Sequence, residues 1–374
     1  MKICVFGAGA IGGYLAVELA LAGHEVSAIV RGTHLDAIRE NGLKLIIEGK
    51  EKVARIAASS NSSDFGPQDY VICSLKAHQS HESAEQFLPL LGPDTAVVTA
   101  MNGIPWWYFY KEGGRFDGRH LESVDPGARQ WIKIGPERAI GCVVDAACEV
   151  IAPGVIEHHE FKRFTIGEPD GTRSKRVKTL SDGLTGANFE APIREQIRWN
   201  VWRKLWGNVC FNPIGALTHA TLDRITTEPG LRQLCKQMMH EAKAVNEALG
   251  INIAKDMIDR RLAAAGSVVG HKMSMLQDLE RHRSMEIDAL VTAVQELGRL
   301  TGVPTPAIDV VLPLVQECAR HAGLYGTPAR KLIDCAINPN AGTESDRIGN
   351  LNPQSSIGGS GKEKCAYGKH NYAG

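Results

Sequence analysis

The chain has 374 residues, which is too long for one ordinary domain and long enough for two domains with separate cores. Its 42 Lys and Arg residues balance 42 Asp and Glu residues without a long block of one sign, so neither nucleic acid nor an anionic membrane surface is expected as the main partner. Nine cysteines without a C-x-x-C spacing indicate reduced thiols and a cytoplasmic location. With no secretory leader pattern and no apolar stretch of membrane-spanning length, we expect an unexported protein.

Short apolar runs alternate with helical patterns through the first half of the chain. The strand candidates are residues 2–6, 25–30, 70–75, 95–100 and 139–144. This alternation predicts an α/β fold of Rossmann type, a doubly wound parallel sheet covered by helices. Further candidates are expected to extend the same sheet: an added hairpin at 43–48 and 52–57, and later strands at 154–159, 163–167 and near 188–193.

The apolar pattern changes to a period of 3.6 from about residue 195, which predicts helices. The helical patterns cover residues 195–211, 228–249, 255–265, 284–302 and 305–322. We therefore predict a Rossmann-type domain at 1–194 and an all-helical domain at 195–336. Residues 337–374 are rich in Gly, Asn and Ser and have few apolar side chains to offset the entropy of ordering, so they are predicted to form a flexible tail.

A G-x-G-x-x-G motif at residues 7–12 follows the first strand and opens an apolar helix. Glycines let the backbone approach a pyrophosphate closely, and the free N–H groups at the helix start favour an anion. A tight strand-to-helix turn without a ligand is the alternative, but the strand before and the helix after favour a dinucleotide site. The residues expected to bind it are Gly7, Gly9, Ala10, Ile11 and Gly12.

Three residues at predicted strand ends extend this site. An acidic side chain about 20 residues past the loop would bind the ribose 2′-hydroxyl of NAD, whereas this place holds Arg31. A guanidinium fits a 2′-phosphate, so Arg31 predicts NADPH, with a solvated loop arginine as the alternative. Lys76 and Asn102 follow the next two strands, at the carboxyl ends where doubly wound sheets bind ligands, and predict the floor of a cleft.

A polar stripe marks the helix predicted at 195–211 and its continuation. Lys204, Asn208 and Asn212 recur at i, i+4 and i+8 and share one helix face, while tryptophans and aliphatic residues occupy the rest of the surface. Buried polar groups need partners, so the stripe indicates either a reaction site or a structural hydrogen-bond network at a domain interface. Reduction of a ketone by hydride requires a proton donor and a nearby positive charge, and Lys204 is the candidate for both.

The motifs together resemble the ketopantoate reductase family, the 2-dehydropantoate 2-reductases of pantothenate biosynthesis. W-R-K-L at 202–205 is followed by Asn208, by N-P at 212–213, by S-M-L-Q-D at 274–278 and by E-I-D at 286–288, and the order holds to about residue 323. The resemblance implies an NADP-dependent oxidoreductase that reduces a small 2-keto acid. It further implies that Lys204 is the general acid and Glu286 its acidic partner, that Asn208, Asn212 and Ser274 bind the substrate, and that Lys76 and Asn102 line the cleft.

The resemblance agrees with the chemistry of the residues and also has departures. Burial beside a carboxylate can tune the pKa of Lys204, although spacing alone leaves Glu286 open as an exposed helix carboxylate. Where the family has a polar residue, often Asn, the chain reads T-L-D at 221–223. The aromatic run at 106–110 is either a lid or pocket wall, or a patch over the domain junction or a subunit interface. Adjacent histidines at 158–159 would point to opposite faces of a strand, and no metal is expected.

Two alternative functions remain open at this point. One is an NAD(P)-dependent dehydrogenase of another hydroxy compound, such as a polyol or sugar acid, on the same scaffold. The other is a non-catalytic NADPH-sensing module, against which the presence of both Lys204 and Glu286 argues. The expected partner is a small molecule, and the sequence leaves a homodimer open.

Overall fold

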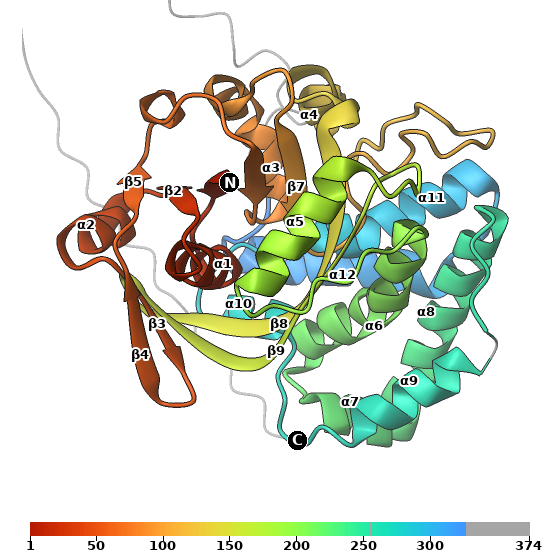
Figure 1. The fold of residues 1–374 in the computed structure, drawn as a ribbon. Coiled ribbons are helices and arrows are strands. Elements are labelled where there is room, and N and C mark those ends of the chain that lie inside the picture. Colours follow the sequence, from red (N-terminus) through yellow and green to blue (C-terminus); the bar gives the residue numbers. More distant parts are fainter. Residues whose placement is uncertain (255, 327–374) are drawn as a thin grey trace, which may run out of the picture. The chain divides into compact units, whose positions relative to one another are not determined.

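The computed structural model describes residues 1–254 and 256–326 (Figure 1). Contacts group residues 1–326 into one compact unit, so the division into domains at residue 194 stays a prediction. The tail predicted at 337–374 lies outside the described residues. None of the described helices combines the length and the apolar character that a membrane crossing requires.

A nine-stranded sheet forms the centre of the N-terminal half, in the order β4-β3-β9-β8-β7-β6-β1-β2-β5. Parallel pairing joins the strands from β5 to β8, and β9 runs antiparallel to β8. At the other edge β3 is parallel to β9 and pairs with β4 as a hairpin. The sheet is therefore mixed rather than wholly parallel, and its strands are β1 (Lys2–Phe6), β2 (Glu25–Ile29), β3 (Leu43–Ile47), β4 (Lys50–Ala54), β5 (Ala57–Ser59), β6 (Tyr70–Cys73), β7 (Ala96–Ala100), β8 (Ala139–Ala152) and β9 (Val155–Gly167).

The hairpin of β8 and β9 is longer than predicted. The candidates at 154–159 and 163–167 join into one strand, because register shifts and the positive φ of Phe161 (57°) let the ladder continue through residues 160–162 between them. The strand predicted near 188–193 was wrong, since this segment forms only two isolated bridges, Arg163 to Glu190 and Ile166 to Ile193. The long hairpin places β8 directly against the helix that carries the polar stripe.

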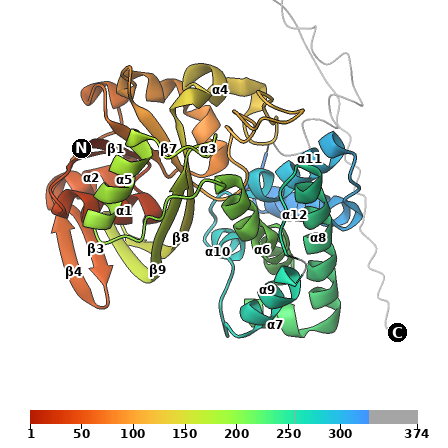
Figure 2. The same ribbon diagram turned by 45° about the vertical axis from the view of Figure 1, so that its right-hand side comes forward.

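Helices account for the second half of the chain and gather on one side of the strands (Figure 2). The helix α6 packs against α8, α10 and α12 and buries its tryptophans Trp202 and Trp206. This burial on several sides explains why the surface of the helix is apolar outside the polar stripe. The predicted helix at 284–302 begins instead with a π-helical turn at Asp288–Thr292, and two short helices, α7 and α10, fall below the length at which periodicity is visible. The helices of this half are α6 (Ile197–Thr218), α7 (Leu222–Thr227), α8 (Pro229–Ala248), α9 (Met257–Gly266), α10 (Ser274–Glu280), α11 (Ala293–Thr301) and α12 (Pro306–His321).

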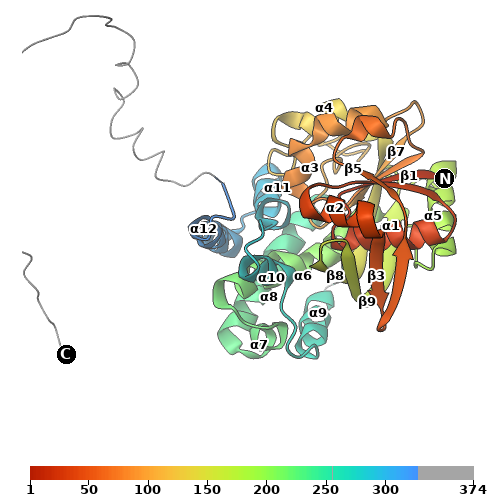
Figure 3. The ribbon, with the colours of Figure 1, turned by 90° about the vertical axis from the view of Figure 1, so that its left-hand side faces the viewer.

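The remaining helices flank the sheet, with α1 and α2 in front of it in the view of Figure 3. Their bounds are α1 (Ala10–Leu21), α2 (Gly32–Asn41), α3 (Ala77–Glu82), α4 (Arg129–Lys133) and α5 (Lys175–Gly186). The helix α1 contacts β1, β2, β3, β8 and β9, so the glycine loop that starts it is fixed from several sides.

The aromatic run at 106–110 belongs to the core between sheet and helices. Trp107 and Phe109 are fully buried, the indole of Trp107 donates a hydrogen bond to Thr99 Oγ1 (2.9 Å), and the indole of Trp202 donates one to the Tyr108 hydroxyl (2.7 Å). This burial supports the interpretation of the run as a pocket wall at the junction of sheet and helices, whereas the lid stays a prediction. The segment packs at the junction of sheet and helices, and Trp107 also lines the small cavity described below.

Candidate active site

The glycine loop has the geometry that an anion site needs. Gly7 has a φ of +95°, and a Cβ on Gly12 would lie 2.2 Å from Ser74 Oγ and 2.3 Å from the Gly7 carbonyl oxygen, so both positions need glycine. A Cβ on Gly9 would meet no atom within 4 Å, which leaves the loop open on that side. Gly9 is the N-cap of α1 and supplies no side-chain cap, so no capping side chain competes with an anion for the first N–H groups of the helix, at Ala10 and Ile11.

Two cavities meet at this loop, and both are lined by Gly7 and Gly9. One, of about 410 Å³, extends to Arg31 at the start of α2. The other, of about 350 Å³, extends past Lys76 and Asn102 to Glu286. Together they make an elongated groove across the carboxyl ends of the strands, and its residues fit a dinucleotide: a guanidinium at one end, an uncapped helix start in the middle and polar side chains at the other end.

His34 is a groove residue that the sequence analysis missed. It lines the cavity that contains Arg31, its Nε2 lies 2.7 Å from the Ala8 carbonyl oxygen, and its Nδ1 accepts a hydrogen bond from the Gly154 amide (2.9 Å). The ring thus ties the glycine loop to the turn between β8 and β9. No local motif marks a histidine for this role, because both of its partners are distant in sequence.

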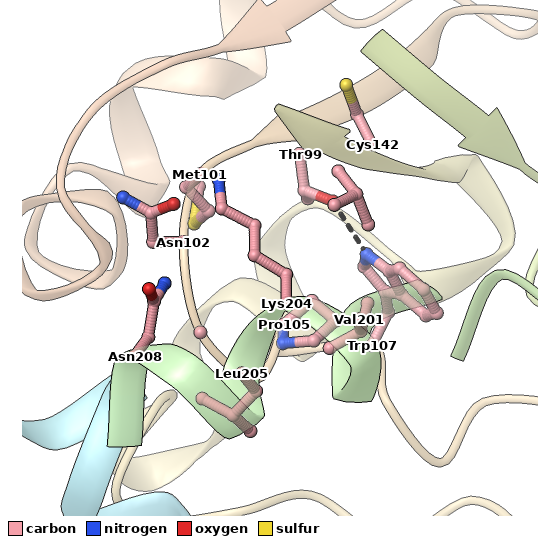
Figure 4. Close-up of a pocket in the computed structure, with 12 residues that line it drawn as sticks. Thr99, Met101, Asn102, Pro105, Trp107, Cys142, Val201, Lys204, Leu205 and Asn208 are labelled. Carbon is pink, nitrogen blue, oxygen red and sulfur yellow. Dashed lines mark hydrogen bonds between the residues drawn. The ribbon is translucent and has the colours of Figure 1, made fainter. Parts of the chain in front are cut away.

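The third cavity, of about 700 Å³, lies where β8 faces α6 and α10 and contains Lys204, Asn208 and Ser274. It shares Ile11 and Asn102 with the groove, so the two are continuous. Figure 4 shows the Lys204 side chain between Asn102 and Asn208 on one side and Trp107 on the other. These residues also line a smaller cavity of about 20 Å³.

Lys204 comes from the second turn of α6, and its ammonium group donates a hydrogen bond to the Val144 carbonyl on β8. Burial of the ammonium lowers the pKa of Lys204 from its ordinary value, while the carboxylates of Asp145 and Glu286 oppose this by favouring the charged form. A lysine held between these opposing effects can release a proton more readily than an exposed one.

Glu286 lies in a polar cluster that joins the sheet to the segment after α10. It accepts a hydrogen bond from Asn102 Nδ2 (3.3 Å), and burial raises its pKa while the charge of Lys76 works in the opposite direction. The Lys76 ammonium contacts the Asp278 carboxylate (2.6 Å) and the Ser284 carbonyl (2.6 Å). The alternative of an exposed helix carboxylate is therefore wrong for Glu286, which lines the groove.

Asn212 lies deeper than the other two residues of the stripe. Its Oδ1 accepts hydrogen bonds from Ser274 Oγ (3.2 Å) and from the Met275 amide (3.1 Å), so it fixes the first turn of α10. Asn208 and Ser274 line the large cavity, whereas Asn212 is absent from its lining. Among the described residues, the buried Nδ2 of Asn212 has no hydrogen-bond partner.

The departure at residues 221–223 has a structural explanation. Leu222 is buried and its amide donates to the His271 carbonyl (2.8 Å), and Asp223 Oδ1 accepts from the Gly270 amide (2.9 Å). The segment thus holds the loop of Gly270 and His271, both of which line the large cavity. It acts on the cavity indirectly, through one backbone and one side-chain hydrogen bond to that loop, and sequence reasoning that looks for a direct contact with the cavity cannot find it.

A Rossmann-type sheet with a glycine loop, a dinucleotide-sized groove and a buried lysine in the cavity that adjoins this groove defines a nicotinamide-dependent oxidoreductase. Comparison with known proteins gives the family. The model of the ketopantoate reductase PanE/ApbA matches residues 3–171, and the model of the C-terminal part of ketopantoate reductase PanE/ApbA matches residues 196–319. The chain belongs to the ketopantoate reductase family.

Individual relatives agree with this assignment. The chain is 53% identical over 326 residues to a 2-dehydropantoate 2-reductase of Mesorhizobium japonicum, which covers 87% of this chain and 100% of the relative. A solved structure from Ralstonia solanacearum MolK2 is 40% identical with a TM-score of 0.83, covering 87% of this chain and 99% of the other. A PanE/ApbA family ketopantoate reductase from Ralstonia eutropha JMP134 is 26% identical with a TM-score of 0.75, covering 86% and 100%.

Proposed function

We propose that this protein reduces a small 2-keto acid to the 2-hydroxy acid, with NADPH as the hydride donor and Lys204 as the proton donor. The observation that carries the proposal is the position of Lys204, which shares a cavity with Asn208 and Ser274 and lies where that cavity joins the glycine-loop groove. Ketopantoate is the first substrate to test, because the relative that is 53% identical is a 2-dehydropantoate 2-reductase.

Lys204 acts on the carbonyl oxygen of the substrate. When bound, the reduced nicotinamide supplies a hydride to the carbonyl carbon. The ammonium of Lys204 stabilises the negative charge that develops on the oxygen and then gives it a proton. Burial lowers the pKa of Lys204 and so makes its proton easier to release, while Asp145 and Glu286 favour the charged form that carries this proton.

Asn208 and Ser274 bind the substrate from neighbouring helices, α6 and α10. Their amide and hydroxyl donors fit a carboxylate or hydroxyl groups, and Asn212 holds Ser274 in place from behind. Glu286 orients Asn102 at the junction of groove and cavity and offers its second oxygen to a substrate hydroxyl. Such a site discriminates strongly against molecules that lack the matching polar groups.

Arg31 supports NADPH rather than NADH as the cofactor. It lies at the end of the groove opposite Glu286, directly after β2, where a carboxylate would be needed to bind a free ribose 2′-hydroxyl. The cytoplasm is the compartment that we propose, because the cysteines at seven described positions are free thiols.

The test is NADPH oxidation, followed by its absorbance, against a panel of ketopantoate, shorter 2-keto acids and oxidised polyols. We expect one 2-keto acid to reach a kcat/KM of about 10⁴ M⁻¹s⁻¹ or more. Preference for an oxidised polyol would show that the substrate is not a 2-keto acid. Tight NADPH binding without turnover of any compound would contradict the proposed reaction and favour a sensing role.

A further inference from the structure

A separate cavity of about 620 Å³ lies where β9 and the segment 192–196 meet the start of α6. We call it the arginine basin, because four arginines line it against a single carboxylate, Glu195. The arginines are Arg163, Arg173, Arg194 and Arg203, and Trp199 and Asn200 also line the cavity. None of its lining residues lines the glycine-loop groove or the cavity that contains Lys204. The roles proposed above therefore give this cavity no function.

The positive charge of the basin arginines is only partly neutralised by neighbouring carboxylates. Arg163 pairs with Glu190 (2.7 Å) and Arg173 with Glu195 (2.9 Å), and both pairs are exposed to solvent. Arg194 lines the basin with an exposed side chain. Exposed ion pairs contribute little to stability, so an anion that enters can take over the guanidinium groups from their carboxylate partners at small cost.

The chemistry of the walls specifies the ligand. A planar guanidinium presents paired donors that match phosphate and carboxylate oxygens, and several of them around one cavity match a ligand with several negative charges. The volume falls within the range of small-molecule sites, and the half-buried indole of Trp199 provides an apolar contact for the carbon skeleton. We propose that the arginine basin binds a multiply charged organic anion, a phosphate ester or a polycarboxylate, and that Arg203 couples this site to Lys204.

The coupling runs through Asp145. Arg203 Nη2 lies 3.2 Å from Asp145 Oδ2, and Arg203 is at the same time a wall of the basin. Asp145 favours the charged form of Lys204 and Arg203 disfavours it, and Arg261 adds positive charge at this corner, where its buried Nε has no hydrogen-bond partner among the described residues. The charged and titratable groups that face Lys204 are Cys142 and Asp145 on β8, Glu286 after α10, and Arg203 on α6.

An anion that binds Arg203 offsets the positive charge of this side chain, so Arg203 neutralises less of the negative charge of Asp145. The Asp145 carboxylate then acts more strongly on the Lys204 ammonium and raises its pKa. Since Lys204 is proposed to work as an acid, the alkaline limb of the pH profile should move to higher pH when the basin is filled. This coupling rests on the proposed function of Lys204, whereas binding to the basin does not.

Binding is tested by titration calorimetry on enzyme saturated with NADP⁺, which keeps the pyrophosphate subsite of the groove filled. The two probes are inorganic pyrophosphate and citrate, and the tighter one identifies the phosphate or the polycarboxylate source. We expect saturable binding that weakens at least tenfold in Arg194→Gln and is unchanged in the control Arg55→Gln, an exposed arginine outside the basin. Absence of saturable binding by either probe, or equal affinity in Arg194→Gln and wild type, overturns the proposal.

Coupling is tested by the pH dependence of kcat/KM with and without the saturating probe. We expect the alkaline limb of the wild type to move to higher pH, and Asp145→Asn to abolish that shift. Binding without a shift of the wild-type profile overturns the coupling. An enzyme without turnover on the whole substrate panel would contradict the proposed function alone, since calorimetry reads the basin without turnover.

Discussion

Asn102 Nδ2 donates a hydrogen bond of 3.3 Å to Oε2 of Glu286, a residue 184 positions later in the chain. Lys76, after the neighbouring strand, reaches the same region through Asp278 and the Ser284 carbonyl. These contacts make the end of the glycine-loop groove and the wall of the large cavity one polar cluster. A displacement of the segment 278–286 would therefore alter both sites together.

Replacing Lys204 with Ala should abolish most turnover and leave NADPH affinity nearly unchanged. In the proposed mechanism the ammonium acts on the carbonyl oxygen of the substrate, and general acid catalysis contributes about 10²–10⁴-fold to rate. Steady-state kinetics gives kcat, and fluorescence titration of NADPH gives the dissociation constant. A folded Lys204→Ala protein with near-normal kcat would show that another group supplies the proton.

The pH profile of kcat/KM should be narrower than unperturbed side chains would give. Activity is lost as pH rises through the pKa of Lys204, which burial places below the ordinary 10.5, and as pH falls through the pKa of Glu286, which burial places above the ordinary 4.5. Glu286→Gln should lower kcat/KM and remove the acid limb while the alkaline limb persists. An acid limb that survives in Glu286→Gln belongs to another group.

Arg31→Ala should weaken NADPH binding by about ten- to a hundredfold, because a charge-assisted hydrogen bond contributes roughly 1.5–3 kcal/mol. NADH lacks the 2′-phosphate, so its affinity should hardly change. Titration of both dinucleotides with both proteins measures the difference. Equal losses for NADPH and NADH would mean that Arg31 supports the groove rather than the phosphate.

Gly103→Ala should destabilise the protein, because Gly103 has a φ of +87° and an added Cβ would lie 2.4 Å from the Ala289 carbonyl oxygen. This is a backbone contact between the loop after β7 and the π-helical turn, so relief requires movement at the polar cluster. Gly113→Ala is the matched control, since Gly113 has a φ of +80° and open space around it. Thermal unfolding should show a clearly larger drop in Tm for Gly103→Ala, and similar drops would contradict the close approach.

Local sequence patterns predicted the parts of the site that local structure builds. The glycine motif lies between β1 and α1 as expected, and the i, i+4, i+8 stripe on α6 carries Lys204 and Asn208 into the cavity. The stripe could not show that Asn212 contacts Ser274 and the start of α10, because that partner is 62 residues away. Helical spacing shows on which face of the helix a side chain lies, but not how deeply that side chain is buried.

Other features that depend on tertiary contacts could not be predicted from the sequence for the same reason. The joining of two strand candidates into β9 depends on its pairing with β8, and His34 holds the glycine loop through the distant Gly154 amide. For the aromatic run at 106–110 the sequence left a lid, a pocket wall and a patch at a junction or interface open, and only the hydrogen bonds of the Trp107 and Trp202 indoles place it inside the core. In each case the deciding partner lies far along the chain.

The loop of Gly270 and His271 should influence substrate selection, because it lines the large cavity. Hydrogen bonds to the segment 221–223 hold this loop in place. Asp223→Ala removes the acceptor for the Gly270 amide and should loosen the loop, because the Asp223 side chain is that amide's partner. We expect KM for the best substrate to rise severalfold and relative kcat/KM across the 2-keto acid panel to change. NADPH affinity should stay the same, because the groove does not include this loop. Asp182→Ala, at an exposed position on α5, is the control that should leave all of these values unaltered. If Asp223→Ala keeps both KM and selectivity, the loop is a passive wall, and Asn208 and Ser274 alone select the substrate.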